Sequence, residues 1–208
     1  MQLILASTSP ARLATLRAAG FEPVVAPSDV DEDAVVEAAE ATSGPLSPED
    51  MVLLLARAKA EAVIGLDTVA KATYSTSDEP TKGVLVLGGD SAFVLDGVIY
   101  GKPHTPEAAT ARWHAQRGRT GHLYSGHWLI DHREGMSNAS VGEVTVAEVT
   151  FANDISDDEL ESYIRSGEPL KVAGAFTIDS LGAAFIDRIS GDPSTVVGVS
   201  VPALRRRP

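Results

Sequence analysis

Three kinds of group that bind phosphate occur together near the start of the sequence, in Ser7-Thr8-Ser9-Pro10-Ala11-Arg12. The hydroxyls, the backbone N–H groups at a helix start and the guanidinium of Arg12 each attract phosphate oxygens. An ordinary capped helix explains the same residues, because serine and proline are common at helix starts. The segment therefore predicts an anion-binding turn only if other residues support it.

Asp90 is a candidate catalytic carboxylate. It follows an apolar run and two glycines, Gly88 and Gly89, at the expected carboxyl end of a buried strand, where ligand groups usually sit in open α/β sheets. The alternative is a polar residue that merely starts the next hairpin. Lys102 follows the return strand of that hairpin, so a two-stranded ribbon would bring its ammonium near Asp90. A lysine in a surface turn is the alternative there.

Other charged residues are less informative by themselves. Glu32 belongs to an acidic segment, residues 29–50, that contains eight Asp or Glu and no Lys or Arg, and Lys59 is expected beside the apolar stripe of a helix. The five histidines form no convincing metal motif, and the absence of cysteine excludes thiolate ligands. No P-loop or G-x-S-x-G pattern occurs. Any metal is therefore expected to be a hard cation, and the nucleophile to be water.

The composition limits which partners such residues can serve. The chain has 208 residues and is 44% hydrophobic, which suffices for one core or two lobes that share a cleft, so we expect a single domain over residues 1–208. A formal net charge of −12 would repel a nucleic acid polymer. The apolar stretches are too short to cross a bilayer and no export signal is apparent. We therefore expect a cytoplasmic protein without a membrane partner.

Helix and strand patterns interleave along the chain, which predicts an α/β fold with a mixed sheet. Caps followed by proline at Ser9-Pro10, Ser47-Pro48 and Thr105-Pro106 predict helix starts, and Ser156 with Glu159 predicts a capping box. Apolar runs, alternation and the hairpin signal Asp96-Gly97 predict the strands. These strands are expected at residues 2–6, 21–26, 83–87, 93–95, 98–100, 119–131 and 143–151, with a loop at 66–83 and short strands and turns at 171–201.

Taken together, these segments resemble the Maf family of nucleoside triphosphate pyrophosphatases. The opening segment is similar to the family's S-x-S-P-R-R motif, and the resemblance continues in order across nearly the whole chain. The further matching segments are Asp29-Val30-Asp31-Glu32, Leu55-Ala56-Arg57-Ala58-Lys59-Ala60, Gly88-Gly89-Asp90-Ser91 (G-A-D-T in the family), Gly101-Lys102-Pro103, Gly118-Arg119-Thr120, Gly167-Glu168-Pro169 and Val196-Val197-Gly198.

The resemblance implies a two-lobed, inosine-triphosphatase-like α/β fold with a central cleft, and a homodimer. It implies hydrolysis of a nucleoside triphosphate, standard or modified, to the monophosphate and pyrophosphate, with Mg or Mn as cofactor, as house-cleaning of the nucleotide pool. Asp90 and Glu32 would hold the metal, and Asp90 would orient the attacking water. The remaining roles fall to cations and polar groups around the nucleotide: Lys59 and Lys102 in catalysis, and Ser7, Arg12 and Asp179 in substrate binding.

Two departures from the family pattern concern the substrate. Ala11 stands where the family commonly has the first of two arginines, so one phosphate contact is missing. Asp179, in Ile178-Asp179-Ser180, stands where the branch acting on thymidine and uridine triphosphates has glutamine. A carboxylate only accepts hydrogen bonds, which suits adjacent N–H donors such as those of guanine. Strict specificity for thymidine and uridine triphosphates is therefore not expected, although Asp179 could simply bond a backbone N–H.

Two other functions remain open from the sequence. One is a non-catalytic nucleotide-sensing protein linked to septum formation, for which Ala11 would mark the loss of catalysis. The other is a phosphatase that releases only the terminal phosphate, using the same groups on a shifted triphosphate. The presence of Glu32, Lys59, Asp90 and Lys102 favours the pyrophosphatase, because a pure binder needs no carboxylate that orients water.

Overall fold

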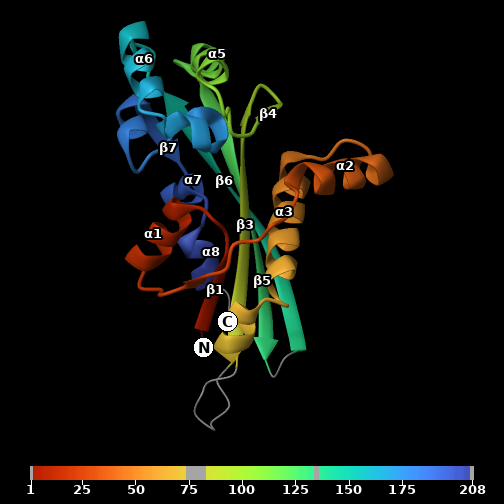
Figure 1. Ribbon diagram of the computed structural model, residues 1–208. Coiled ribbons are helices and arrows are strands. Elements are labelled where there is room, and N and C mark those ends of the chain that lie inside the picture. Colours follow the sequence, from red (N-terminus) through yellow and green to blue (C-terminus); the bar gives the residue numbers. More distant parts are fainter. Residues whose placement is uncertain (1, 74–82, 134–135, 207–208) are drawn as a thin grey trace.

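The computed structural model describes residues 2–73, 83–133 and 136–206, which form one seven-stranded mixed sheet with helices on both sides (Figure 1). The strand order is β2-β1-β3-β5-β6-β7, and β4 pairs with β3. β1 is parallel to β2 and β3, and the other pairs are antiparallel. The strands are β1 (Gln2–Ala6), β2 (Val24–Val25), β3 (Val84–Leu95), β4 (Val98–Tyr100), β5 (Thr120–Arg133), β6 (Met136–Phe151) and β7 (Ile186–Ser190).

The helix starts follow the predicted capping signals. The side chains of Ser9, Ser47 and Thr105 accept hydrogen bonds from the first turns of α1, α3 and α5, and the capping box of Ser156 and Glu159 opens α6. The helices are α1 (Pro10–Ala18), α2 (Glu32–Ser43), α3 (Pro48–Val63), α4 (Asp67–Thr73), α5 (Pro106–Gln116), α6 (Asp157–Arg165), α7 (Pro193–Val197) and α8 (Val201–Arg205), with 3-10 turns at Glu168–Lys171, Ala173–Ala175 and Leu181–Phe185.

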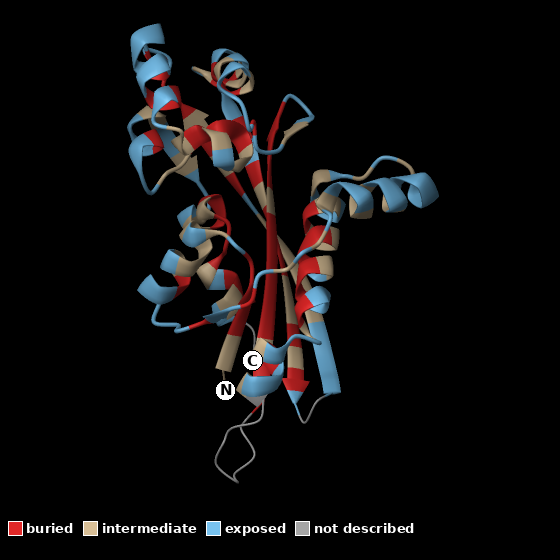
Figure 2. Ribbon diagram, viewed as in Figure 1, coloured by how far each residue is buried: buried red, intermediate tan, exposed pale blue. Residues whose placement is uncertain are grey.

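The lower half of the sheet is covered on both faces (Figures 1 and 2). Alternate residues of β1 point to opposite sides because the side-chain period of a strand is two. Leu5 packs with Leu16 of α1 and Val199 just before α8, whereas Ile4 packs with Val63 of α3. This lobe is thus a three-layer arrangement with β1 and β3 at its centre.

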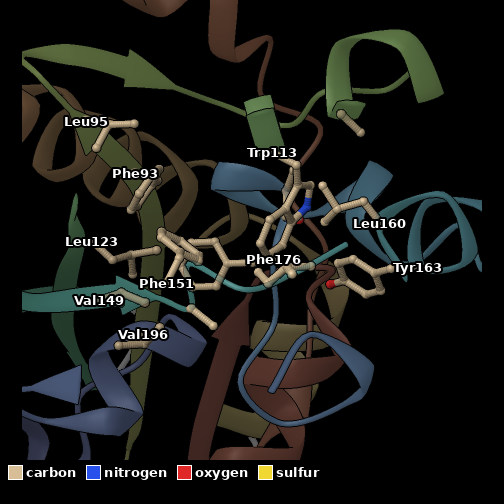
Figure 3. Close-up of a cluster of buried hydrophobic side chains, with 14 of the residues drawn as sticks. Phe93, Leu95, Trp113, Leu123, Val149, Phe151, Leu160, Tyr163, Phe176 and Val196 are labelled. Atoms are coloured by element: carbon tan, nitrogen blue, oxygen red, sulfur yellow. The ribbon is translucent and has the colours of Figure 1, made fainter. Parts of the chain in front are cut away.

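The upper half has a separate core built around aromatic rings (Figure 3). Trp113 of α5 and Phe176 each meet Phe151 of β6 edge to face, with ring centroids 5.4 and 5.0 Å apart. The long strands β3, β5 and β6 run through both halves, so one sheet carries the aromatic core above and two apolar clusters, one on each face, below. The predicted two-lobed, mixed-sheet α/β fold is confirmed.

Several predicted boundaries were wrong. β2 covers only Val24–Val25 of the expected strand at 21–26. Within the expected loop at 66–83, residues 67–73 form α4, whose Val69 is fully buried in the lower core. Residues 74–82 lie outside the described residues. The segment 171–201 contains 3-10 turns and α7 besides β7.

The largest difference concerns the strand that carries Asp90. β3 does not end before Asp90 but continues to Leu95. The cause is β5, which pairs with β3 from Val84 to Val94 and places Gly126 opposite Asp90. Asp90 therefore lies inside a strand, at the level where the lower core gives way to the upper one.

Candidate active site

A cavity of about 630 Å³ lies between the two lobes, at the level of Asp90. It is lined from below by the β1–α1 turn, from the side by α2 and α3, and from above by residues 171–179. All the side chains that the sequence singled out line this one cavity: Ser7, Arg12, Glu32, Lys59, Asp90, Lys102 and Asp179.

The cavity opens beside β3 because one edge of this strand is only partly paired. β1 pairs with β3 up to Ala6 and Gly88, and β4 pairs with it from Phe93 onward, while β5 occupies the opposite edge throughout. Between them, no described strand covers the edge beside Asp90. The chain continues from β1 into the β1–α1 turn and from β4 toward Lys102, so residues that follow both bordering strands line the same gap.

Two glycines allow α3 to lie directly on the sheet. A Cβ added to Gly88 would be 2.0 Å from the carbonyl oxygen of Ala56, and one added to Gly126 would be 2.3 Å from that of Val52. Any side chain there would push the helix away. Gly88 and Gly126 thus allow the close approach of α3 to the sheet.

This close packing places Lys59 within the buried face of α3, and not beside it as predicted. Lys59 is 7% exposed, and its Nζ donates to Asp90 Oδ1 over 2.6 Å and lies 2.8 Å from Glu32 Oε1. Glu32 is the first residue of α2 and remains half-buried. A buried ammonium is tolerated here because two carboxylates flank it.

The two carboxylates are shifted in opposite directions. Burial raises the pKa of Asp90 above its ordinary value, although Lys59 and Arg12 oppose this change. Partial burial also acts to raise the pKa of Glu32, but the hydrogen bond and charge of Lys59, helped by Lys102, outweigh it and the pKa is lowered. Asp90 is therefore more basic than an ordinary aspartate, and Glu32 stays ionised to lower pH than an ordinary glutamate.

Arg12 is tied to the protein by three hydrogen bonds. Its Nε donates to the carbonyl of Gly198 (2.8 Å), Nη1 to Ser7 Oγ (3.1 Å) and Nη2 to Ser91 Oγ (2.8 Å). Burial lowers the pKa of Arg12, and the nearby carboxylates of Asp90 and Glu32 oppose that shift. The guanidinium thus joins the residue that follows β1, β3 and the residue that follows α7. Its remaining N–H groups are the ones available to a ligand.

Ser91 and Ser125 extend this network and were not predicted. Their hydroxyls lie 2.9 Å apart, and Ser125 donates to the carbonyl of Thr195 in α7. Ser91 belongs to the Gly-Gly-Asp-Ser segment, so its position next to Asp90 was a usable signal. Ser125 had no signal, because only the pairing of β3 with β5 places it opposite Ser91.

The far end of the cavity is more apolar. Phe176, Ile178, Val172 and Ala173 line it, with Asp179 exposed at the rim. This end suits a flat organic group, and the cationic end suits an anion. Lys171 and His104 add further polar groups to the lining, and Ala11 lines the wall near Arg12 without reaching far into the cavity.

A divalent cation at this site would take oxygen ligands from Asp90 and Glu32. Across the described ranges, no three His, Cys, Asp or Glu side chains group closely enough to hold a metal by themselves. The Lys59 ammonium already lies between the two carboxylates. Two carboxylates supplemented by phosphate oxygens are a usual ligand set for Mg²⁺. The residues fit a cation that enters together with a triphosphate, and not one held by the protein alone.

Comparison with known proteins shows which family this sequence resembles. The sequence matches the family described as Maf-like protein over residues 2–207. A protein of Leifsonia xyli subsp. xyli named nucleoside triphosphate pyrophosphatase is 65% identical over 205 residues, covering 99% of this chain and 90% of its own. Proteins of the same name from Nocardia farcinica (48% identity, 98% of this chain and 90% of theirs) and Corynebacterium efficiens (47%, 99% and 92%) are also similar.

Proposed function

The chain belongs to the Maf-like protein family, and on that basis we propose that it hydrolyses nucleoside triphosphates to the nucleoside monophosphate and pyrophosphate. The observation that carries the proposal is the Asp90–Lys59–Glu32 group, which borders an anion-binding turn in a single cavity. We propose modified or surplus nucleotides as the physiological substrates.

The cationic end of the cavity would hold the triphosphate. Lys102 and Lys59 supply positive charge, while Ser7 and the N–H groups at the start of α1 supply hydrogen bonds. Negative charge develops on the leaving pyrophosphate as the bond between the α-phosphorus and the bridging oxygen breaks. Positioned cations stabilise that charge, which is the main form of catalysis open to a protein in phosphoryl transfer.

Asp90 would act on the attacking water. The water oxygen bonds to the α-phosphorus, its proton passes to the Asp90 carboxylate, and pyrophosphate leaves with the bridging oxygen. Without a bound cation, burial raises the pKa of Asp90 and so makes this carboxylate a better proton acceptor than an exposed aspartate. Lys59 holds the Asp90 Oδ1 atom in place through its 2.6 Å hydrogen bond, which orients the carboxylate toward the cavity it lines.

We include Mg or Mn in the proposal, held by Asp90 and Glu32 together with phosphate oxygens. When bound, such an ion neutralises phosphate charge and orients the triphosphate. Because the pKa of Glu32 is lowered, this carboxylate stays ionised, and so able to bind a cation, to lower pH than an ordinary glutamate.

A product assay tests the reaction. The protein is incubated with a panel of standard and modified nucleoside triphosphates and Mg or Mn, and pyrophosphate, orthophosphate and monophosphate are measured separately. Equal amounts of pyrophosphate and monophosphate are expected. Orthophosphate alone would place the cleavage at the terminal phosphate, and tight binding without any product would favour a nucleotide sensor.

The assembly and location are further parts of the proposal. The described residues contain no helix that is both long and apolar enough to cross a membrane. We propose a cytoplasmic homodimer on the strength of the family resemblance. Light scattering on the purified protein measures its mass in solution, and a value equal to one chain would contradict the dimer.

A further inference from the structure

The carboxylate of Glu168 accepts five hydrogen bonds. The hydroxyls of Tyr163 and Thr177 and the backbone N–H of Gly182 donate to Oε1, at 3.1 Å for Tyr163 and 3.0 Å for Gly182. Ser180 Oγ (2.8 Å) and the backbone N–H of Leu181 (3.2 Å) donate to Oε2. Partial burial acts to raise the pKa of Glu168, but these bonds outweigh it and hold the pKa below its ordinary value.

Four of the five donors belong to one loop, residues 177–182. The loop curls around the Glu168 carboxylate, and Gly182 permits the tight curl, since a Cβ there would lie 2.7 Å from both the N and the O of Thr177. Asp179 lies between the donors Thr177 and Ser180. Thr177, Ile178 and Asp179 line the cavity, whereas Glu168 does not. The carboxylate therefore acts on the cavity only through the loop it holds.

Discrimination by a carboxylate depends on where that carboxylate is held. Polar selectivity arises when a wrong partner leaves a donor or acceptor unpaired, and a loop that can move relieves that penalty. Asp179 is exposed, and within the described ranges no hydrogen bond to its own side chain fixes it. Instead, the residues around Asp179 in the chain are held, because Thr177 and Ser180 donate hydrogen bonds to Glu168.

We infer that Glu168 is a positioning residue for nucleobase selection, which holds the loop 177–182 so that Asp179 meets the N–H donors of the base. The inference rests on the proposed function: with the triphosphate at the cationic end of the cavity, the base would lie at the apolar end, which Phe176 and Ile178 line. Glu168 lies apart from the phosphate end, where Asp90, Lys59 and Glu32 act. Its loss should therefore change the choice of base and not the chemical step.

The test is the Glu168→Gln variant, in which an amide NH₂ group replaces one carboxylate oxygen. This group cannot accept the hydrogen bonds that the loop donates to that oxygen. KM and kcat are measured by pyrophosphate release for the best and the worst base of the panel. We expect KM for the best base to rise about tenfold, kcat to stay within about twofold, and the ratio of kcat/KM between the two bases to fall by about tenfold. Ser180→Ala removes one donor and is expected to cause a smaller change of the same kind.

A double-mutant cycle tests whether Glu168 affects base selectivity through Asp179. In an Asp179→Ala background, Glu168→Gln should change selectivity no further, because the loop would have no carboxylate to present. Glu161→Gln removes a charge from an exposed ion pair on α6 and serves as the matched control, with selectivity unchanged. Additive effects, or an equal loss of kcat for every base, would overturn the inference.

Two further outcomes are separable. If circular dichroism shows that Glu168→Gln does not fold, Ser180→Ala replaces it in the test. The change in base selectivity that Ser180→Ala causes is then measured with and without Asp179→Ala. If the wild-type protein releases no pyrophosphate, the proposed function fails. The variants are then compared by calorimetric Kd values for the same triphosphates, and an unchanged ratio of Kd values between bases overturns the inference independently.

Discussion

Lys59 Nζ and Asp90 Oδ1 are 2.6 Å apart, although the two residues are 31 positions apart in the chain and each is less than 10% exposed. The pair joins α3 to the interior of β3. Because both charged groups are withdrawn from water, removing one of them would leave the other buried without its partner. The catalytic role that we propose for Asp90 therefore depends on the packing of α3.

Replacing Asp90 by asparagine keeps the shape of the side chain but removes the proton acceptor. We expect kcat for pyrophosphate release to fall by roughly 100-fold or more, while nucleotide binding stays measurable by calorimetry. Asp96→Asn, in the exposed turn after the same strand, is the control and should keep its activity. Full activity in Asp90→Asn would remove Asp90 from the mechanism.

An alanine at Gly88 tests the approach of α3. The added Cβ would collide with the carbonyl of Ala56, so the helix must shift and Lys59 must move away from Asp90. We expect the free energy of unfolding in urea to fall by about 1–3 kcal/mol and kcat/KM to fall with it. Gly65→Ala, where a Cβ meets nothing within 4 Å, is the control. Wild-type stability and activity in Gly88→Ala would contradict the packing argument.

Arg12→Lys keeps a positive charge but lacks the planar fork that reaches three acceptors at once. We expect the free energy of unfolding to decrease by about 1–3 kcal/mol and KM for the triphosphate to rise roughly tenfold, because the β1–α1 turn loses its ties to Ser91 and Gly198. Arg17→Lys on the exposed side of the same helix should behave like wild type. Unchanged KM and stability would mean that charge alone matters at position 12.

His127 predicts a dependence of stability on pH. Burial, followed by the charge of Arg12, lowers the pKa of His127 from 6.5 to about 4, and its Nε2 accepts the backbone N–H of Ser200 over 2.9 Å. Between these two pKa values the unfolded chain binds more protons than the folded one. Stability from this group is thus complete above pH 6.5 and is lost as the pH falls toward 4.

The expected loss is about 2 kcal/mol in the free energy of unfolding between neutral pH and about pH 5, measured by urea denaturation. His127→Gln should remove most of this slope, because glutamine does not titrate. His114→Gln, at an exposed position of α5, should retain it. The same slope in wild type and His127→Gln would assign the acid sensitivity to other groups.

Local signals in the sequence were sufficient for much of the fold. Ser47 before Pro48, the capping box at Ser156 and the Asp96-Gly97 hairpin were all confirmed, because caps and tight turns depend on residues a few positions apart. The order of short motifs also sufficed to predict the family. Where the secondary structure of a segment depends on residues far away in the chain, the prediction was wrong. Examples are α4, which was expected to be a loop, and β3, which was expected to end before Asp90.

The sequence alone determined which side chains could do chemistry: the Ser7 to Arg12 turn, Glu32, Lys59, Asp90, Lys102 and Asp179. Only the tertiary structure decided how they meet. Gly88 and Gly126 bring α3 onto the sheet, so that Lys59 is buried between two carboxylates, and Arg12 proves to be tied to the protein as well as open to a ligand. The physical reason is that pKa values, hydrogen-bond partners and burial depend on groups brought together by strand pairing and helix packing, which no local pattern encodes.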